Sequence, residues 1–209
     1  PENGGVKIPV AMIDILASHQ MRSAVTTGLY ARERGATGWY AQVSLELSGI
    51  AALVNQATNY LMNDSVPQRR GSIHPNIAPY GEQLEFEDGN LVLAIGSDAQ
   101  VRSLWEVLGK PELGRDSRYL TNHDRVIHRV QLISDLQKLV TGNQRESLLQ
   151  QFHESRVPAG AVRTLDEVFA PGSPGAKAVI KEEIEHSTRP LVKPRTTAYS
   201  VTIFGNEMT

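Results

Sequence analysis

The sequence predicts an α/β protein in which part of a large α/β domain precedes a small α+β domain, and three observations predict this class. An amphipathic helix, an alternating strand and a second amphipathic helix follow one another over residues 13–61, as in an α/β domain. Residues 63–83 are rich in Pro, Gly and polar side chains, which is typical of a linker. A hairpin signal and several short helices then occupy residues 84–186.

These changes in composition set the expected domain boundaries. We expect residues 1–62 to be part of the large domain and residues 63–83 to form a linker and a loop. Residues 84–186 then form the small domain, and residues 187–209 return toward the large domain. The last segment is rich in β-forming residues, which fits one or two edge strands.

Composition excludes several classes of protein. The 209 residues include 21 Lys and Arg and 23 Asp and Glu, a net charge of −2, so we expect no nucleic-acid-binding surface. Cysteine is absent, which excludes disulfides and thiolate zinc sites and suits a reducing compartment. No apolar run approaches the ~20 residues of a membrane span, so we expect no membrane partner. The chain begins with Pro1 rather than Met, so we expect a fragment or a cleaved product.

The spacing of apolar residues predicts the elements of the first domain. Over residues 13–34 they recur every three or four positions, which predicts a helix with one buried face that Gly35 ends. Apolar and polar side chains alternate over residues 39–45, which predicts a strand. A second apolar stripe over residues 47–61 predicts a second helix.

Turn residues predict a hairpin in the small domain. Residues 84–86 and 91–95 flank Asp88 and Gly89, a pair that supplies the positive φ angles of a type I′ turn. Further signals predict helices at residues 98–108, at 126–140 with a cap near Thr121, near 148–152, and after a capping box at 164–167. They also predict a loop at residues 171–175 and a strand at residues 179–185.

The loop at residues 71–81 carries the candidate binding residues His74, Asn76 and Tyr80. The ring N–H of His74 and the amide of Asn76 can donate hydrogen bonds to a carboxylate or to a developing oxyanion. Alternatively, His74 packs within the loop and Asn76 holds the turn through its own backbone. Tyr80 either contacts a ligand or anchors the loop by packing.

Metal chemistry is not expected. His123 and His128 are five residues apart, which is not the i, i+4 spacing of a zinc-binding helix. No glycine-rich phosphate-binding motif and no serine nucleophile elbow occur in the sequence. The chemistry therefore has to be sought in the loop.

Several motifs resemble one family in their order and spacing. They are GSIHPNIAPY at residues 71–80, DGNLVLAIGSDAQ at 88–100, LWEVLG at 104–109 and YLTNHDRVIHR at 119–129. This set resembles the middle of the class III coenzyme A transferases, also called the CaiB/BaiF or formyl-CoA transferase family. The resemblance covers roughly residues 5–186 and includes Arg32, Glu33 and Arg34 before the first glycine turn.

The resemblance implies a Rossmann-like large domain, a small α+β domain and an interlocked homodimer. It implies an enzyme that moves coenzyme A from an acyl-CoA to a carboxylic acid, both of which are substrates. No permanently bound cofactor is implied. In the family mechanism an aspartate attacks the thioester and forms an enzyme-bound anhydride. That aspartate is expected upstream of Pro1, so we expect no catalytic residue in this chain, and Asp14 matches a different family position.

The same resemblance assigns roles to the loop. In family members it reaches toward the acyl-CoA site, so His74, Asn76 and Tyr80 would be substrate-binding residues. Its His-Pro-Asn-Ile-Ala-Pro-Tyr form is most like members that act on dicarboxylates, such as succinyl-CoA with glutarate. A cytoplasmic location is expected, or a mitochondrial one in a eukaryote.

Two alternatives remain open from the sequence. The first is an acyl-CoA racemase of the same fold, which uses proton transfer instead of an aspartate nucleophile. The second is a non-catalytic fragment or split subunit that completes a partner chain. If partner strands come from outside residues 1–209, the helices at 13–61 cannot be fully buried by this chain alone.

Overall fold

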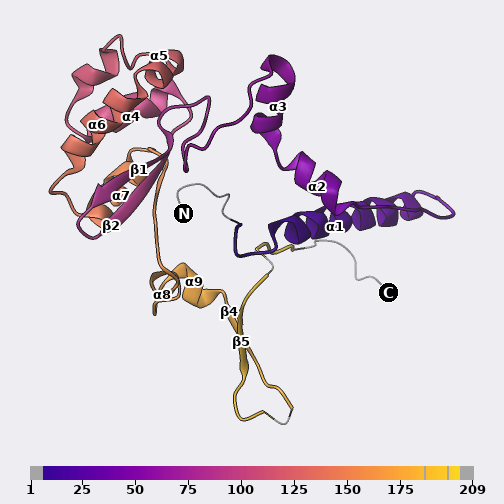
Figure 1. The fold of residues 1–209 in the computed structure, drawn as a ribbon. Helices are drawn as coiled ribbons and strands as arrows, with labels where there is room; N and C mark the ends of the chain where they lie inside the picture. The colour runs from indigo at the N-terminus through magenta and orange to yellow at the C-terminus, as the bar shows by residue number, and fades with distance from the viewer. Residues whose placement is uncertain (1–6, 186, 197, 203–209) are drawn as a thin grey trace. The chain divides into compact units, whose positions relative to one another are not determined.

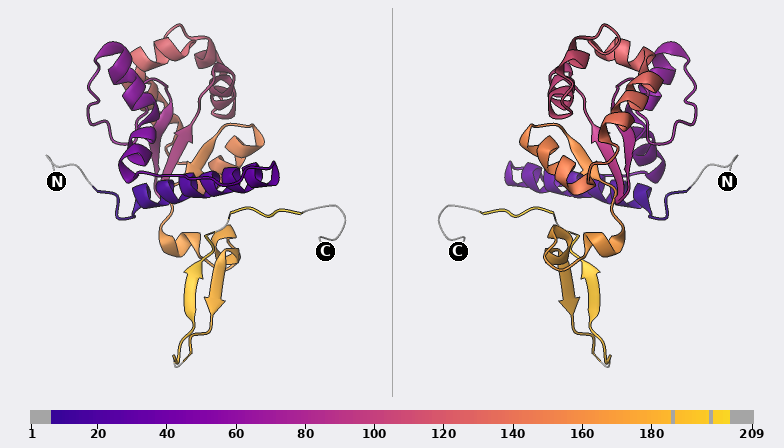
Figure 2. Two further views of the ribbon diagram at one scale, coloured as in Figure 1. Left: turned by 90° about the vertical axis from the view of Figure 1, so that its right-hand side faces the viewer. Right: turned by 90° about the vertical axis from the view of Figure 1, so that its left-hand side faces the viewer.

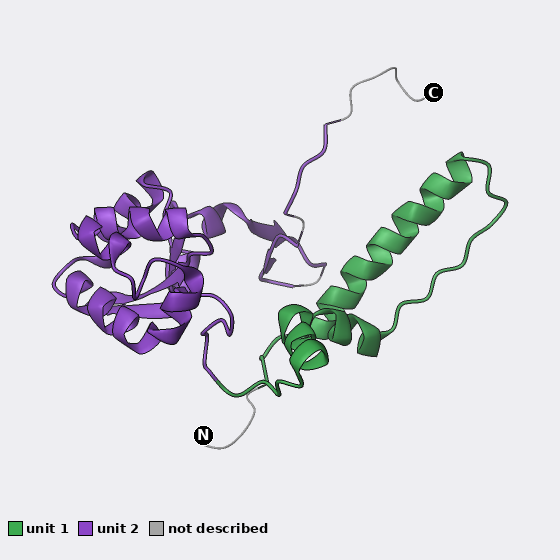
Figure 3. Ribbon diagram, turned by 90° about the horizontal axis from the view of Figure 1, so that it is seen from above, with its two compact units in different colours: residues 1–69 green, residues 70–209 purple. Residues whose placement is uncertain are grey.

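The protein divides into two compact units, residues 1–69 and residues 70–209 (Figure 3). The structure is a computed structural model, and it describes residues 7–185, 187–196 and 198–202. Each unit is described by itself below. No helix among these residues is long and apolar enough to cross a membrane.

The first unit consists of three helices: α1 (Met12–Glu33), α2 (Leu45–Ala51) and α3 (Val54–Asn63) (Figure 1). The helix predicted at 13–34 is confirmed. The helix predicted at 47–61 divides in two at Ala52 and Leu53, where Val54 has a positive φ of 43°. Such a φ is unfavourable for a β-branched residue and interrupts the helix.

The strand predicted at residues 39–45 is wrong. Residues 39–44 have no regular secondary structure, and Leu45 already belongs to α2. A strand needs a neighbour to accept its backbone hydrogen bonds, and none of the described segments pairs with this one. The ring of Trp39 instead lies against Gly28, where a Cβ atom would be only 2.2 Å from the ring. Side-chain packing therefore holds this segment to α1.

The helices of the first unit bury little of their surface. Gly28 and Ser48 are their only fully buried residues within the described part of the chain. Within the first unit itself the three helices leave large apolar side chains exposed; that residues 1–209 as a whole cannot bury them stays a prediction. Their exposed large apolar side chains include Ile13, Met21, Leu29, Leu47, Ile50, Leu61 and Met62.

The second unit contains a three-stranded antiparallel sheet in the order β1–β2–β3. The strands are β1 (Tyr80–Phe86), β2 (Gly89–Ala94) and β3 (Ala159–Ala161). The predicted hairpin is confirmed, and Leu84 pairs with Leu91 in it. The predicted type I′ turn at Asp88 and Gly89 is wrong. Gly89 already pairs with Phe86, so the turn residues are Glu87 and Asp88, and neither has a positive φ. A type I′ turn needs positive φ at both central residues.

Five helical segments accompany this sheet. Ser97 and Gln100 form a capping box at the start of the predicted 98–108 helix, and Thr121 and Asp124 form another where a cap was predicted. The helix predicted at 126–140 begins earlier and divides in two at His128. The segments are α4 (Asp98–Val107), the 3-10 helix η1 (Pro111–Arg115), α5 (Asn122–Ile127), α6 (Arg129–Val140) and α7 (Arg145–Glu154).

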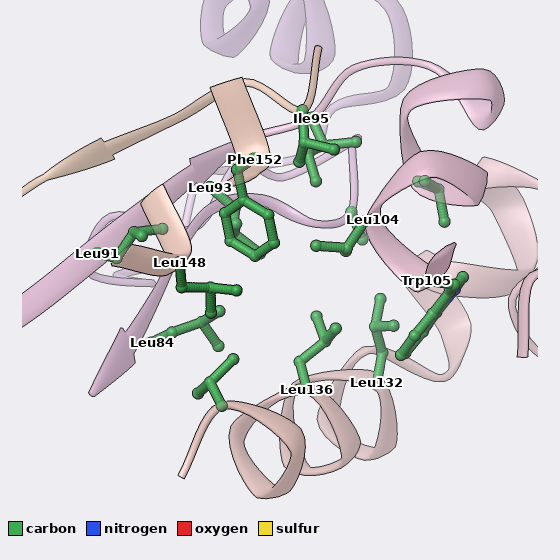
Figure 4. Packing of buried hydrophobic residues seen from close by; sticks show 14 of the residues in the cluster. Leu84, Leu91, Leu93, Ile95, Leu104, Trp105, Leu132, Leu136, Leu148 and Phe152 are labelled. Carbon is green, nitrogen blue, oxygen red and sulfur yellow. The ribbon is translucent and has the colours of Figure 1, made fainter. Parts of the chain in front are cut away.

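The hydrophobic core lies between the sheet and α4, α6 and α7 (Figure 4). Leucines of the β1–β2 hairpin face α6 across this core, and Trp105 of α4 stacks on Tyr119 with ring centroids 5.6 Å apart. Burying such side chains contributes about 1.5–3 kcal/mol each relative to exposure. The core residues labelled in the figure are Leu84, Leu91, Leu93, Ile95, Leu104, Trp105, Leu132, Leu136, Leu148 and Phe152.

The chain after β3 forms two short helices and a second hairpin (Figure 2). The capping box at 164–167 is confirmed at α8 (Leu165–Val168), whereas the loop predicted at 171–175 leads into α9 (Pro174–Lys177). The predicted strand is β4 (Val179–Glu182), and β5 (Leu191–Pro194) is an antiparallel partner for it. Residues 203–209 of the predicted edge strands lie outside the described residues.

Candidate functional site

The loop at residues 71–81 is closed on itself where β1 begins. The Ser72 hydroxyl donates to the Gly81 carbonyl at 2.5 Å, and the His74 N–H donates to the Tyr80 carbonyl at 2.9 Å. Gly81 has a φ of 84°, and a Cβ atom there would be 2.0 Å from the Ser72 carbonyl oxygen. Glycine is therefore required at this crossing.

The three predicted binding residues lie together in this loop. The His74 ring contacts Tyr80 edge-on, with centroids 5.3 Å apart, and its Nδ1 accepts the Asn76 N–H at 3.2 Å. His74 is half-buried, whereas Asn76 and Tyr80 are exposed. When Nδ1 accepts, a neutral imidazole carries its proton on Nε2, so the ring can still act as a donor.

Side chains from α5 and α6 hold the backbone of the same loop. Asn122 donates from Nδ2 to the Asn76 carbonyl at 2.8 Å and accepts the Ala78 N–H at Oδ1 at 3.1 Å. Arg129 donates to the Ile77 carbonyl at 2.7 Å. These three hydrogen bonds join the loop to side chains more than forty positions away in sequence.

Arg125 joins the loop to the core of the unit. Its side chain is 1% exposed, and its Nε donates to the Ala78 carbonyl at 2.7 Å. The guanidinium also donates to the Tyr119 carbonyl at 3.0 Å and to the Asp98 carboxylate at 2.6 Å. Arginine suits this position because its planar fork can satisfy several acceptors at once.

Glu82 is a buried carboxylate two residues into β1. Its side chain is 2% exposed, and the nearest cation is Arg129, 3.4 Å away and 12% exposed. Neither of its oxygens accepts a well-formed hydrogen bond from the described residues. Burial raises the pKa of Glu82 above its ordinary value, and the charge of Arg129 opposes this shift. Burial likewise lowers the pKa of Arg129, where Glu82 opposes the shift and Arg70 adds to it.

The connector before α5 is fixed by a second set of polar contacts. Hydrogen bonds from Arg118, led by the side-chain pair at 2.6 Å, hold the pKa of Asp116 down to about 2. Tyr119 donates to Asp135 at 2.8 Å, and burial together with this bond raises the pKa of Tyr119 to about 12. These groups orient the connector that leads to Asn122.

Other features of the described residues offer less chemistry. A hollow of about 420 Å³ in the first unit is lined by side chains of α1, α2 and residues 42–44, none of them charged. No cluster of three His, Cys, Asp or Glu side chains that could hold a metal occurs in the described part of the chain. The polar groups that point to a binding site therefore belong to the loop.

Sequence reasoning found the loop but missed most of the residues that hold it. Asn122 and Arg125 were noticed only within the motif at 119–129, and Arg129 and Glu82 were not singled out. One signal was available, because Glu82 shares the inward face of β1 with Leu84. A glutamate is almost never fully buried unless it is paired, so a charged residue at a position that should be apolar is an informative signal.

Comparison with known proteins decides the family. The model of CoA-transferase family III matches residues 1–202. The chain belongs to this family. The family relationship implied by the sequence motifs is thereby confirmed.

Curated relatives include two glutarate CoA-transferases. The chain is 35% identical to the succinate–glutarate CoA-transferase of Agrobacterium fabrum, over 81% of this chain and 42% of the relative. It is 32% identical to the succinyl-CoA:glutarate CoA-transferase of Homo sapiens, over 90% of this chain and 43% of the relative. The chain thus spans less than half the length of these relatives.

Solved structures agree on the fold. A CaiB/BaiF family protein from Brucella suis superposes with a TM-score of 0.61 at 31% identity, over 94% of this chain and 55% of that one. Rv3272 from M. tuberculosis gives a TM-score of 0.77 at 19% identity, over 96% of this chain and 52% of that one. The second likeness supports the fold alone.

Proposed function

We propose that this chain is part of an enzyme that moves coenzyme A from succinyl-CoA to a dicarboxylate such as glutarate. The observation that carries the proposal is the similarity, over most of this chain, to two CoA-transferases named for glutarate. The loop adds support, because it brings the hydrogen-bonding side chains of His74 and Asn76 close to each other. Such side chains suit a carboxylate substrate.

The nucleophile of the proposed reaction is an aspartate outside residues 1–209. Its carboxylate attacks the carbonyl carbon of the thioester, the C–S bond breaks, and the coenzyme A thiolate leaves. The acyl group remains on the enzyme as a mixed anhydride. The thiolate then attacks the aspartyl carbonyl of the anhydride, which releases the donor carboxylate and leaves coenzyme A as a thioester on the aspartate. The acceptor carboxylate attacks this thioester to form a second anhydride, and the displaced thiolate attacks the acceptor carbonyl of that anhydride, which gives the new acyl-CoA and frees the aspartate. Because anhydrides hydrolyse in water, the site has to exclude solvent during these steps.

The loop supplies binding groups to this site. His74 donates from Nε2, and Asn76 presents its side-chain amide, so both stabilise a carboxylate or the oxyanion of the tetrahedral intermediate. Tyr80 supports the His74 ring through their edge contact. No base is required of these residues, because the nucleophile is already an ionised carboxylate at neutral pH.

We further propose that the working enzyme is a homodimer. The apolar side chains exposed on α1, α2 and α3 support this, because patches of this kind mark surfaces that other protein segments cover. We also propose that the enzyme is cytoplasmic.

The test begins with the native protein. Its intact mass and N-terminal sequence show whether an aspartate-bearing segment precedes Pro1. The protein is then incubated with succinyl-CoA and isotope-labelled glutarate, and labelled glutaryl-CoA is measured by mass spectrometry. We expect transfer only when the aspartate-bearing portion is present, and trapping should give a covalent adduct on that aspartate.

Two results would overturn the proposal. Transfer by residues 1–209 alone would show that the nucleophile lies in this chain. Solvent deuterium entering the α-carbon of a 2-methylacyl-CoA, without any transfer of coenzyme A, would favour the racemase instead.

A second candidate is a non-catalytic subunit that supports a partner chain. The exposed apolar faces of α1–α3 favour it, since a partner could cover them without any chemistry in this chain. It predicts that the assembled protein keeps full transferase activity when His74 is replaced by Ala. The transferase proposal predicts a large loss in the same variant.

A further inference from the structure

Three consecutive residues of the loop are held by side chains rather than by secondary structure. The carbonyls of Asn76, Ile77 and Ala78 and the N–H of Ala78 all bond to side chains of α5 and α6. Loop backbone usually bonds to water and moves freely. This run is instead fixed at four points, immediately beside His74.

Arg129 contacts both the loop and Glu82 of β1. One terminal nitrogen donates to the Ile77 carbonyl at 2.7 Å, while the other lies 3.4 Å from the Glu82 carboxylate. Glu82 in turn is almost completely buried. The guanidinium therefore lies between the loop and a fixed negative charge.

The Glu82–Arg129 pair is not explained by stability. Removing two charges from water costs more than a loosely formed pair returns, and apolar replacements of buried pairs are often neutral or stabilising. The oxygens of Glu82 lack good hydrogen bonds, so the compensation here is incomplete. A buried charge in this position orients Arg129 toward the loop.

We propose that Asn122 and Arg129 are positioning residues that hold the backbone of Asn76–Ala78, with Glu82 orienting Arg129. That they thereby present His74 and Asn76 to a carboxylate substrate rests on the proposed function. Holding the loop in its binding geometry in advance lowers the entropy lost when substrate binds. None of the three needs to touch the reacting atoms.

Amide exchange on the 209-residue chain tests the holding role without any activity. The N–H groups of His74 and Asn76 are hydrogen-bonded within the loop, and the Ala78 N–H bonds to the Asn122 side chain, so all three report on the order of the loop. Asn122→Ala should speed their exchange about tenfold, while amides of α4 and α7 stay unchanged. Asn143→Ala is the matched control, because that amide bonds only to carbonyls at the end of α6.

Two conservative variants separate the individual contacts. Asn122→Asp keeps the acceptor for the Ala78 N–H and loses the donor to Asn76, so it should loosen the loop less than Asn122→Ala. Arg129→Lys keeps the charge but cannot reach both partners. Glu82→Gln keeps the size and removes the charge, and it should speed loop exchange as Arg129→Lys does.

Kinetics of the assembled transferase test the positioning role. Each variant should raise KM for the acceptor carboxylate about tenfold with a smaller change in kcat, and Asn143→Ala should change neither. Unchanged loop exchange in Asn122→Ala and Arg129→Lys, or equal acceleration throughout the unit, would overturn the proposal. Unchanged exchange in Glu82→Gln alone would overturn the role of Glu82.

The two proposals fail in different ways. If the loop loosens in the variants but the native protein transfers no coenzyme A, the proposed function fails and the holding role stands. If the native protein is an active transferase, and the substitutions change neither KM nor amide exchange in the loop, the positioning role fails and the proposed function stands.

Discussion

Glu82 is a charged residue in the interior, although charged side chains generally lie at the protein surface. Strand β1 turns it inward with Leu84, and no described group satisfies its oxygens fully. Natural sequences depart from local rules mainly at functional or strained sites. The charge of Arg129 acts on Glu82, and the charges of Glu82 and Arg70 act on Arg129. The titration of Glu82 therefore reports on this group of side chains.

Stability of the second unit should fall with rising pH because of Glu82. Burial raises its folded pKa above the ordinary 4.5, so the folded state retains a proton that the unfolded state has lost. This stabilising contribution is fully present below pH 4.5 and is lost as pH rises through the folded pKa. Glu82→Gln should therefore gain in unfolding free energy relative to the wild type over that window. Denaturant melts at a series of pH values measure it, and parallel profiles for the two proteins would contradict it.

At the residue scale, the sequence predicts where a binding loop is and not what holds it. His74, Asn76 and Tyr80 stand in one short run that contains Pro75 and Pro79, so their proximity is local. Whether they bind substrate stays a prediction. Asn122 and Arg129 meet the loop across 46 and 52 positions, and such pairings depend on the packing of α5 and α6. Local patterns carry no information about that packing.

At the scale of elements, periodicity and caps predict most of the helices. The capping boxes at Ser97, Thr121 and Thr164 lie where helices begin, because they depend only on neighbours in sequence. The strand at 39–45 fails for the opposite reason, since alternation shows two faces but cannot supply a pairing partner. Strand β3 was missed because Ala159–Ala161 is too short to show a pattern.

The attachment of residues 39–44 to α1 can be tested at Gly28. A Cβ atom there would lie within 2.2–2.7 Å of the Trp39 ring, so Gly28→Ala should displace the ring into solvent. Over-packing of this kind costs about 1–3 kcal/mol, against a gain of about 1 kcal/mol from helix propensity. Acrylamide quenching of tryptophan fluorescence should increase, with buried Trp105 as a constant background.

A matched glycine supplies the control for this experiment. Gly38 has open space around its Cβ position, so Gly38→Ala should leave the quenching unchanged. If Gly28→Ala also leaves it unchanged, Trp39 does not pack on α1 and the segment is held in another way.

At the scale of the whole molecule, burial is divided unequally between the two units. Among the described residues, the sixteen that form the buried apolar core lie between Ala78 and Val157, in the second unit. The α/β class and the presence of a small α+β part were predictable, because each follows from the order of elements along the chain. How α1–α3 are covered was not, because the strand expected between them finds no partner within the described residues.

This division predicts that replacing a leucine costs little stability in the first unit and much more in the second. Leu61 of α3 is 78% exposed, so Leu61→Gln should change the unfolding free energy of the 209-residue chain by about 0.5 kcal/mol or less. Leu136 of α6 is fully buried among the other core residues, and Leu136→Ala should cost about 2–5 kcal/mol because it leaves a cavity. Chemical denaturation monitored by circular dichroism measures both.

In the assembled enzyme we expect Leu61→Gln, and not Leu136→Ala, to be the variant that weakens assembly. If protein segments cover the apolar face of α3 there, Leu61→Gln places an unpaired amide in that contact and should weaken assembly. Leu136→Ala leaves that surface intact and should assemble normally at temperatures where it is folded. Analytical ultracentrifugation of the two variants separates these effects. Equal assembly by the wild type and Leu61→Gln would show that α3 stays exposed in the enzyme, and the contact would then have to be sought on α1 or α2.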